Sequence, residues 1–340
     1  MIQIRDITSR ILRLPAMCWQ LFLVTGERKP RFPNVPDRLN AVVRDHMIEF
    51  EKTGDRNLLY LEAAGYVILE YLQIRCFDEG AHSFWGARQV DDKGNLWYGF
   101  PLRVILVGET LFMLRNCSGF QEICFRLKQR DLRSSYYEML AAKIFARAGF
   151  DIRMRLERRP GETKKRGEEF DFTATRGRTI LAAEVTALEE KEFNERTAIN
   201  ALNNKRTQLP NDKPTVFFCV LPPAWGNSGI DLNDWTANVA NEFFQSGSRR
   251  INRVVFYIEQ HVDGPTPTLG GGFITIARSF DHPNPYFPFN FDRIFDVRGD
   301  SERMSLLMED SFENSESQQA LLKLTRTGEF YEWVDSFHDE

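Results

Sequence analysis

Two acids in the middle of the chain have surroundings that suggest metal chemistry. Asp171 and Glu184 lie within the stretch 170–187, and each stands inside an apolar run. A carboxylate among apolar residues is costly unless it is paired or bound to a metal ion. Two carboxylates about 4 Å apart repel by roughly 4 kcal/mol at an effective dielectric constant near 20. A divalent cation would turn that repulsion into attraction, so both acids are candidate ligands for such a cation.

The residues around both acids predict two short strands joined by a turn. Phe170 and Phe172 alternate with polar residues, which is the period of a half-buried strand. Along the second strand, Glu184 falls on the same face as Ala182. Gly177 lies between the two runs and marks the turn. Two adjacent strands of this kind would bring one acid from each strand together.

Helices are predicted on either side of these strands. Residues 134–149 form a helical pattern that contains Glu138 and stops at Gly149, and a polar helix is expected over about 193–207. On that second helix, the apolar residues Ala198, Ala201 and Leu202 lie at i, i+3 and i+4. Lys205 follows at i+7 and therefore lies in the same stripe. A helix packed on the sheet could therefore aim Lys205 at the acids. The apolar run Thr215–Leu221 predicts the next strand.

This order of helix, two strands, helix and strand resembles the core of the PD-(D/E)xK nuclease superfamily, which has the restriction-endonuclease-like fold. The resemblance covers about residues 134–222. It implies hydrolysis of phosphodiester bonds in nucleic acid, with Asp171 and Glu184 holding Mg²⁺ or Mn²⁺ and Glu138 as a third acid. The implied partner is nucleic acid, with DNA placed ahead of RNA.

Position 186 departs from the family pattern, which has a lysine two residues after the second acid. This chain has Thr186 there. In some family members the lysine comes from a neighbouring element, and Lys205 is the candidate here for positioning water or steadying developing charge. Thr186 also supports an alternative, a catalytically degenerate nuclease-fold protein that acts as a nucleic-acid-binding or protein-interaction subunit.

Ordinary structural interpretations exist for the same residues. Ser135 and Glu138 have the spacing of a capping box, in which Glu138 satisfies backbone donors at a helix start. Asp171 could be the acid of a turn or an edge strand. Lys205 could cover apolar surface with its stem.

Basic residues gather just before Asp171. Between positions 141 and 166, nine basic residues stand against three acids. A cationic loop beside a carboxylate site suits contact with a phosphate backbone, although a solvated loop would have the same composition. The predicted nucleic-acid-binding residues are Arg153, Arg155, Arg158, Arg159, Lys164, Lys165 and Arg166.

Composition narrows the class of protein. The chain has 340 residues, 42% of them hydrophobic, and a net charge of −4, which argues against a protein that coats DNA non-specifically. Its five cysteines form no CxxC pair, which argues against a zinc site and favours a reducing cytoplasm. The apolar stretch 11–24 is interrupted and too short to span a bilayer, so no membrane association is expected.

We therefore predict an α/β (α+β) protein in three parts. A mostly helical N-terminal region covers 1–130, and a nuclease-like domain with a mixed central β-sheet flanked by helices covers 131–299. An acidic helical tail covers 300–340, where eleven acids stand against three basic residues. The aromatic loop at 281–292 and this tail suggest a third hypothesis, a structural partner subunit. A homodimer or a larger complex is left open.

Overall fold

A computed structural model describes most of the middle of the chain, namely residues 56–76, 99–129, 132–155, 167–189, 192–226, 229–246, 249–262, 272–292 and 294. The predictions for the apolar stretch 11–24, for the basic residues 158–166 and for the acidic tail 300–340 fall outside these residues. The described residues belong to two compact units. The first contains α4 (Arg56–Leu72) and α5 (Gly99–Leu114) as far as Phe112, and the second contains Met113–Val262 and the described residues from Phe273 onward.

In the first unit, α4 and α5 pack closely because one position has no side chain. A Cβ atom at Gly108 would lie only 2.6 Å from the Cβ of Ala64, so any larger residue at 108 would push the helices apart. Both helices fall within the region 1–130 that was predicted to be mostly helical. No helix of the described segments is long and apolar enough to cross a membrane.

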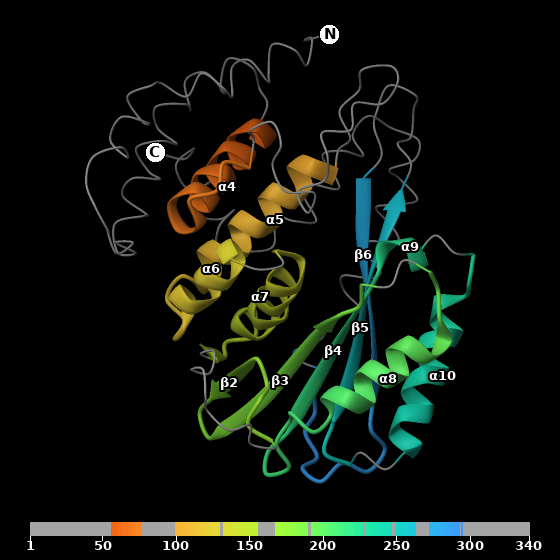
Figure 1. The fold of residues 1–340 in the computed structure, drawn as a ribbon. Coiled ribbons are helices and arrows are strands. Elements are labelled where there is room, and N and C mark those ends of the chain that lie inside the picture. The colour runs from red at the N-terminus through yellow and green to blue at the C-terminus, as the bar shows by residue number, and fades with distance from the viewer. Residues whose placement is uncertain are drawn as a thin grey trace. The chain divides into compact units, whose positions relative to one another are not determined.

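The second unit is built on a six-stranded mixed sheet, which confirms the predicted α/β class (Figure 1). Strand β2 runs antiparallel to both β1 and β3, whereas β3, β4 and β5 run parallel to one another. The strands lie side by side in the order of the sequence. They are β1 (Asp151–Met154), β2 (Phe172–Arg176), β3 (Thr179–Ala187), β4 (Thr215–Leu221), β5 (Arg253–Val262) and β6 (Gly272–Asp281).

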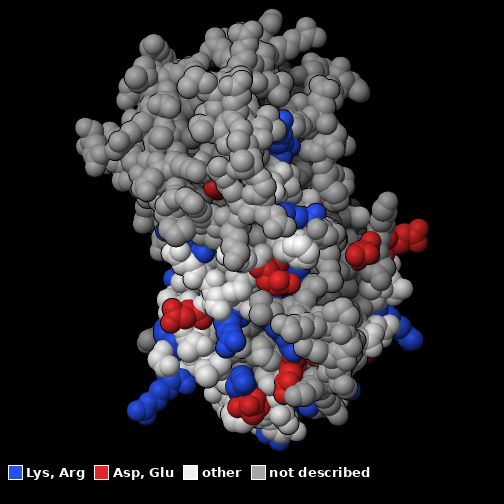
Figure 2. Space-filling model, turned by 60° about the vertical axis from the view of Figure 1, so that its left-hand side comes forward, with Lys and Arg blue, Asp and Glu red and all other residues white. Residues whose placement is uncertain are grey.

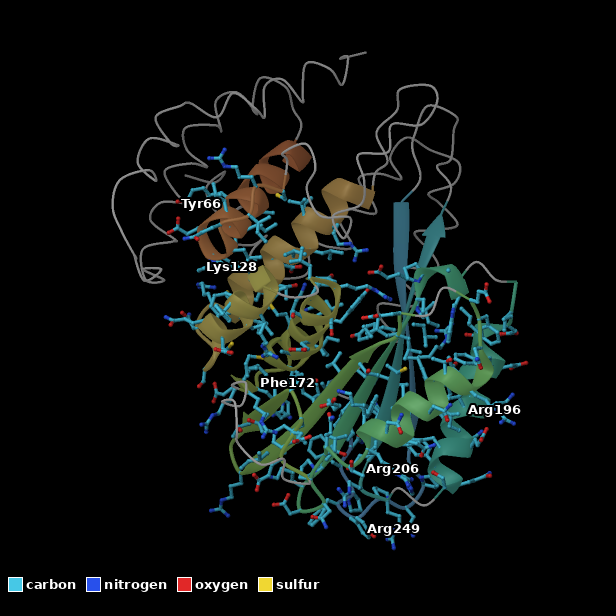
Figure 3. The ribbon with its side chains drawn as sticks, viewed as in Figure 1. Tyr66, Lys128, Phe172, Arg196, Arg206 and Arg249 are labelled. Atoms are coloured by element: carbon cyan, nitrogen blue, oxygen red, sulfur yellow. The ribbon has the colours of Figure 1, made fainter. Side chains whose placement is uncertain are left out.

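Helices cover both faces of this sheet (Figure 1). On one face Phe145 of α7 contacts Phe172 and Phe218, with ring centroids 5.7 and 6.2 Å apart. On the other face, α8 and α10 share a buried cluster with alternate residues of β3, β4 and β5. Figure 3 shows Arg196 on the α8 side, away from Phe172. The helices of this unit are α6 (Phe120–Gln129), α7 (Leu132–Arg147), α8 (Glu195–Lys205), α9 (Pro223–Gly226) and α10 (Leu232–Gln245).

The sequence of β4 explains why helices pack on both faces of the sheet. All seven of its residues are buried, as expected for a parallel strand between two helical layers. Phe217 and Cys219 belong to the cluster on the α8 face, whereas Phe218 points to α7. The described cysteines carry no disulfide, and three of the four are buried, where cysteine behaves as a small apolar residue.

One strand was missed by the sequence analysis. Arg153 was placed in a basic loop, but it lies in β1, which pairs with β2 from Asp151 opposite Thr175 to Met154 opposite Phe172. Ile152 and Met154 are buried, and the charged residues that alternate with them, Asp151 and Arg153, are exposed. Four residues with alternating charges carry too weak a strand signal to stand out from a basic segment.

The strand around Asp171 also differs from the prediction. Strand β2 begins at Phe172, and the chain bends at Asp171. Because of this bend, Phe170 packs against the cluster on the α8 face, whereas Phe172 faces α7. The prediction that the two phenylalanines share a face was therefore wrong. The turn at Gly177 is confirmed, with a φ of 60°.

Helix α7 begins earlier than expected. It starts at Leu132, so Ser135 lies inside the helix and the capping-box interpretation is wrong. The predicted end is confirmed, because Gly149 has a φ of 77° and the amide of Phe150 donates to the carbonyl of Phe145 at 3.1 Å.

The predicted aromatic loop at 281–292 is irregular. Side chains from β5 and from the residues just before that strand contact the loop and fix its position. Asn252 donates from its amide nitrogen to the carbonyl of Phe287 at 2.5 Å, and Arg249 lies over the ring of Tyr286. Tyr286 remains 53% exposed and Phe287 41%. The role of this loop as an interface stays a prediction.

Candidate active site

Glu184 lies in the interior of the sheet, on the face that carries α8. It is in the middle of β3, opposite Phe217 of β4, and only 1% of its surface is exposed. The apolar residues that make this stretch a good strand also surround the carboxylate with apolar groups. Such an acid must find a counter-charge or a hydrogen-bond donor inside the protein.

Asp171 is held beside this part of β3 by two hydrogen bonds. Its backbone amide donates to the carbonyl of Ala183 at 2.9 Å, and its Oδ2 accepts from the backbone amide of Val185 at 2.7 Å. These contacts flank Glu184 on both sides along the strand. The structure therefore brings the two predicted acids together, with the Asp171 carboxylate fixed by the backbone of β3.

Lys205 supplies the counter-charge. It is the last residue of α8, and its Nζ lies 3.0 Å from Oε1 of Glu184. The predicted stripe on this helix is confirmed, since Ala198 and Leu202 are fully buried against the sheet. The inward orientation of Lys205, predicted from that stripe, is therefore observed. The role of Lys205 in catalysis remains a prediction.

Glu138 approaches the same group from α7, and it has a partner of its own. Nη1 of Arg126, on α6, donates to its carboxylate at 2.7 Å. Nη2 of the same guanidinium donates to the backbone carbonyl of Arg155 at 3.3 Å. Arg126 thus joins α6, α7 and the end of β1. The charge of Glu138 still acts on Glu184 and Lys205, while its role as a third acid stays a prediction.

Burial and mutual repulsion shift the ionisation of the acids. The pKa of Glu184 is raised well above its ordinary value, first by burial and then by the charge of Asp171, and Lys205 only partly opposes this. Burial likewise raises the pKa of Asp171 against the opposing effect of its bond from Val185. For Lys205, burial lowers the pKa, but Glu184 and the other acids outweigh it and the net shift is upward.

One residue of this site was not found from the sequence. Gln208 follows α8 by one turn, and its side-chain amide lies against Glu184. We assign the amide with its nitrogen toward the acid, because the opposite orientation sets three oxygens against one another, although its oxygen would then accept from Lys205 Nζ at 3.3 Å. In the assigned orientation the nitrogen donates to Oε1 at 2.6 Å and to Oε2 at 3.2 Å. A single glutamine in a polar segment gives no sequence signal, and only the turn after α8 brings it here.

Of the residues predicted to bind nucleic acid, the structure describes Arg153 and Arg155, and both lie near the segment of Asp171. Arg153 is exposed on β1, and Arg155 follows that strand and donates its backbone amide to the carbonyl of Asp171 at 2.8 Å. The other predicted cations, from Arg158 to Arg166, are outside the described residues. On the face shown in Figure 2, the described basic side chains are interspersed with acids rather than gathered in one patch.

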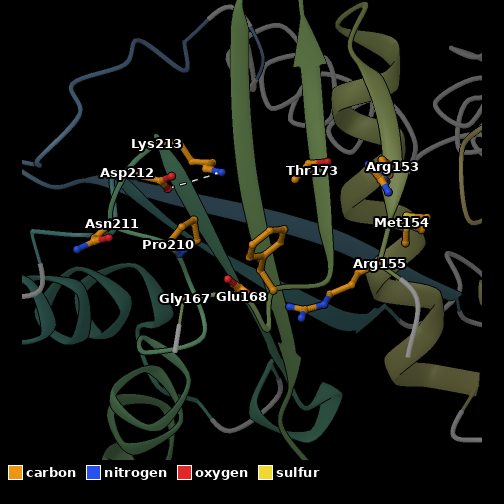
Figure 4. Close-up of a pocket in the computed structure, with 11 residues that line it drawn as sticks. Arg153, Met154, Arg155, Gly167, Glu168, Thr173, Pro210, Asn211, Asp212 and Lys213 are labelled. Atoms are coloured by element: carbon orange, nitrogen blue, oxygen red, sulfur yellow. Dashed lines mark ion pairs between the residues drawn. The ribbon is translucent and has the colours of Figure 1, made fainter. Parts of the chain in front are cut away.

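Both arginines line a pocket of about 610 Å³ beside the segment that leads into Asp171 (Figure 4). The pocket lies between the end of β1, the segment before β2 and the loop before β4. Its lining residues are Arg153, Met154, Arg155, Gly167, Glu168, Phe170, Thr173, Pro210, Asn211, Asp212 and Lys213.

The types and positions of the side chains at this site decide whether they could bind a metal ion. Within the described part of the chain, no group of three or more His, Cys, Asp and Glu side chains is placed to hold a metal. Mg²⁺, however, is usually bound through one or two carboxylates and completes its shell with water and substrate phosphate. Asp171 and Glu184 form such a pair, and their raised pKa values mark a place where added positive charge would be stabilising. The residues therefore fit a Mg²⁺ or Mn²⁺ ion held by two carboxylates.

No family model, no curated protein sequence and no solved structure matches this chain.

Proposed function

We propose that this protein is a metal-dependent nuclease that hydrolyses phosphodiester bonds in nucleic acid. The observation that carries the proposal is the 3.0 Å contact between Lys205 Nζ and Glu184 Oε1, beside a second buried acid. Two carboxylates and one lysine, converging from two adjacent strands and a helix, are the residue types that this chemistry needs.

The order of elements supports the proposal. Helix α7 is followed by the antiparallel strands β1 to β3, and α8 then leads to β4, which runs parallel to β3. Apart from the additional strand β1, this is the order that led to the resemblance to PD-(D/E)xK nucleases. The acids lie on or next to β2 and β3, and the lysine comes from the helix that follows, which compensates for Thr186.

Each residue would have a distinct part in the reaction. Asp171 and Glu184 would hold a Mg²⁺ or Mn²⁺ ion, which supplies an activated water and stabilises negative charge on the phosphate. Lys205 would place its ammonium group close to the developing charge, a preorganised contribution typically worth 10²-fold or more in rate. Gln208 would keep the Glu184 carboxylate in a fixed orientation through its two hydrogen bonds.

The second candidate is a degenerate member of this fold that binds nucleic acid without cutting it. The observation in its favour is the same ion pair, because Lys205 already compensates Glu184 without any metal. Thr186 in place of the family lysine favours it as well. In this candidate, the acids and Lys205 would form a structural ion pair below a binding surface.

Metal binding and cleavage separate the two candidates. Purified protein should bind Mg²⁺ or Mn²⁺ in calorimetry and cut labelled DNA or RNA only when metal is present. Asp171→Asn and Glu184→Gln should each abolish cleavage and weaken metal binding. Asp151→Asn, which changes an exposed acid on β1, is the matched control and should keep both.

Two results would reject the enzyme proposal. The first is a wild-type protein that binds neither metal and cuts no single-stranded or duplex substrate. The second is cleavage that persists in both acid variants at the level of Asp151→Asn, because it would come from another site or from a contaminant.

A further inference from the structure

We infer that the pocket beside Asp171 holds one unpaired nucleotide, so that the proposed nuclease acts on single-stranded nucleic acid or at an unpaired nucleotide. The inference rests on the proposed function for the cleavage step and on the pocket itself for binding. It names a substrate class that the positions of the acids do not specify. Four features of the pocket support it, namely its position, an aromatic surface, its charge and its size.

The pocket lies beside the backbone of Asp171. Phe170 lines it and immediately precedes Asp171, while Arg155 lines it and donates its backbone amide to the carbonyl of Asp171 at 2.8 Å. Arg153 and Thr173, which also line it, are paired across β1 and β2. A nucleotide in the pocket would therefore have its phosphate next to the proposed metal ligands.

An aromatic ring and a guanidinium form one side of the pocket. The guanidinium of Arg155 lies over the ring of Phe170, 5.5 Å from its centroid. Phe170 is only partly buried, since it packs against the core cluster and also lines the cavity. Aromatic rings and guanidinium planes are the two surfaces on which proteins stack unpaired bases. A base that enters the pocket meets both.

The charge of the pocket suits one phosphate rather than a long backbone. Among the described residues, three cations line it, Arg153, Arg155 and Lys213, against the two carboxylates of Glu168 and Asp212. Lys213 and Asp212 pair with each other at 3.6 Å. A protein that makes roughly six to ten phosphate contacts along duplex DNA needs as many cations, and the described part of this lining offers far fewer. The carboxylates instead suit the amino groups on the edge of a base.

Size and shape complete the argument. At about 610 Å³, the pocket falls within the roughly 300–1,000 Å³ of sites that enclose small organic ligands. A base in a duplex is covered on both faces by its neighbours and cannot enter a concave pocket unless it leaves the stack. The pocket therefore selects an unpaired nucleotide.

Binding can be measured without cleavage. In EDTA, fluorescence anisotropy would compare a single-stranded DNA, an RNA of the same sequence, the corresponding DNA duplex and a free mononucleotide. We expect the single strands to bind at least tenfold more tightly than the duplex, and a 2-aminopurine in the strand to be quenched on stacking. The DNA and RNA arms identify the preferred sugar, and tight binding of the mononucleotide alone would overturn the polymer substrate.

Variants locate the binding to the pocket. Phe170→Ala should weaken single-strand binding by about 5- to 150-fold, the range for loss of one stacked base. Phe170→Leu keeps most of the apolar bulk that the core contacts but has no ring, so it should lose the 2-aminopurine quenching while its melting temperature stays near that of wild type. Tyr286→Ala removes an exposed ring elsewhere and is the matched control.

The outcomes distinguish this inference from the proposed function. Equal affinity for single strand and duplex, with Phe170→Leu unchanged, would overturn the pocket inference even if the protein cuts nucleic acid. Conversely, quenching that depends on Phe170, in a protein that never cuts with any metal, would support the pocket and reject the nuclease.

Discussion

The contact between Lys205 and Glu184 yields the most direct prediction. The Nζ–Oε1 distance is 3.0 Å, with the glutamate side chain 1% exposed and the lysine side chain 39% exposed. At an effective dielectric constant of 20, Coulomb's law gives ~5.5 kcal/mol at this distance. Because more than a third of the lysine is in contact with solvent, screening reduces that value, and we expect a coupling free energy of about 1–3 kcal/mol.

A double-mutant cycle measures this coupling. Lys205→Met keeps most of the stem and removes the charge, and it should lower the free energy of urea unfolding in EDTA by about 1–3 kcal/mol, because Glu184 is left buried without its partner. In a Glu184→Gln background, the same change should cost less than about 0.5 kcal/mol. Equal losses in both backgrounds would refute the reasoning, since Lys205 would then contribute only through its stem.

The same variant tests the catalytic role. Lys205→Met should lower kcat by ~10²-fold or more, with little change in nucleic-acid affinity. Arg196→Met removes an exposed cation from the other end of α8 and is the matched control. Thr186→Lys in the Lys205→Met background should recover part of the activity, because residue 186 lies on the same face of β3 as Glu184. An inert wild type together with an active Thr186→Lys would instead identify a degenerate nuclease.

Two further predictions concern the surroundings of Glu184. Gln208→Met removes both hydrogen bonds to the carboxylate and should weaken Mg²⁺ affinity by about 10- to 100-fold in calorimetry; unchanged affinity would show that Gln208 does not orient Glu184. The second concerns pH: Asp171 and Glu184 have raised pKa values, so the native state holds protons that the unfolded chain releases. The melting temperature in EDTA should therefore fall as pH rises from the ordinary carboxyl range to the raised pKa values. Glu184→Gln should flatten that fall, and Mg²⁺ at a hundred times its Kd should add ~2.7 kcal/mol at pH 8; a melting temperature that rises with pH in EDTA would contradict the prediction.

The sequence by itself determined the elements with clear periodicity and the faces of their residues. The strand at Thr215–Leu221 was predicted with its observed bounds, and the stripe on α8 correctly placed Lys205 toward the sheet. These predictions succeed because side-chain direction repeats every two residues in a strand and every 3.6 in a helix, which is local information. The same information separated the two faces of β3, and so placed Glu184 with Ala182.

Only the tertiary structure decided which charges meet. The pairing of Lys205 with Glu184 spans 21 positions, and that of Arg126 with Glu138 joins two helices. Local periodicity gives the direction of a side chain but not the distance between two elements, which depends on the turns that join them and on the packed side chains between them. The bend at Asp171 and the short turn that carries Gln208 were therefore missed, because both depend on packing between elements and neither leaves a periodic pattern in the sequence.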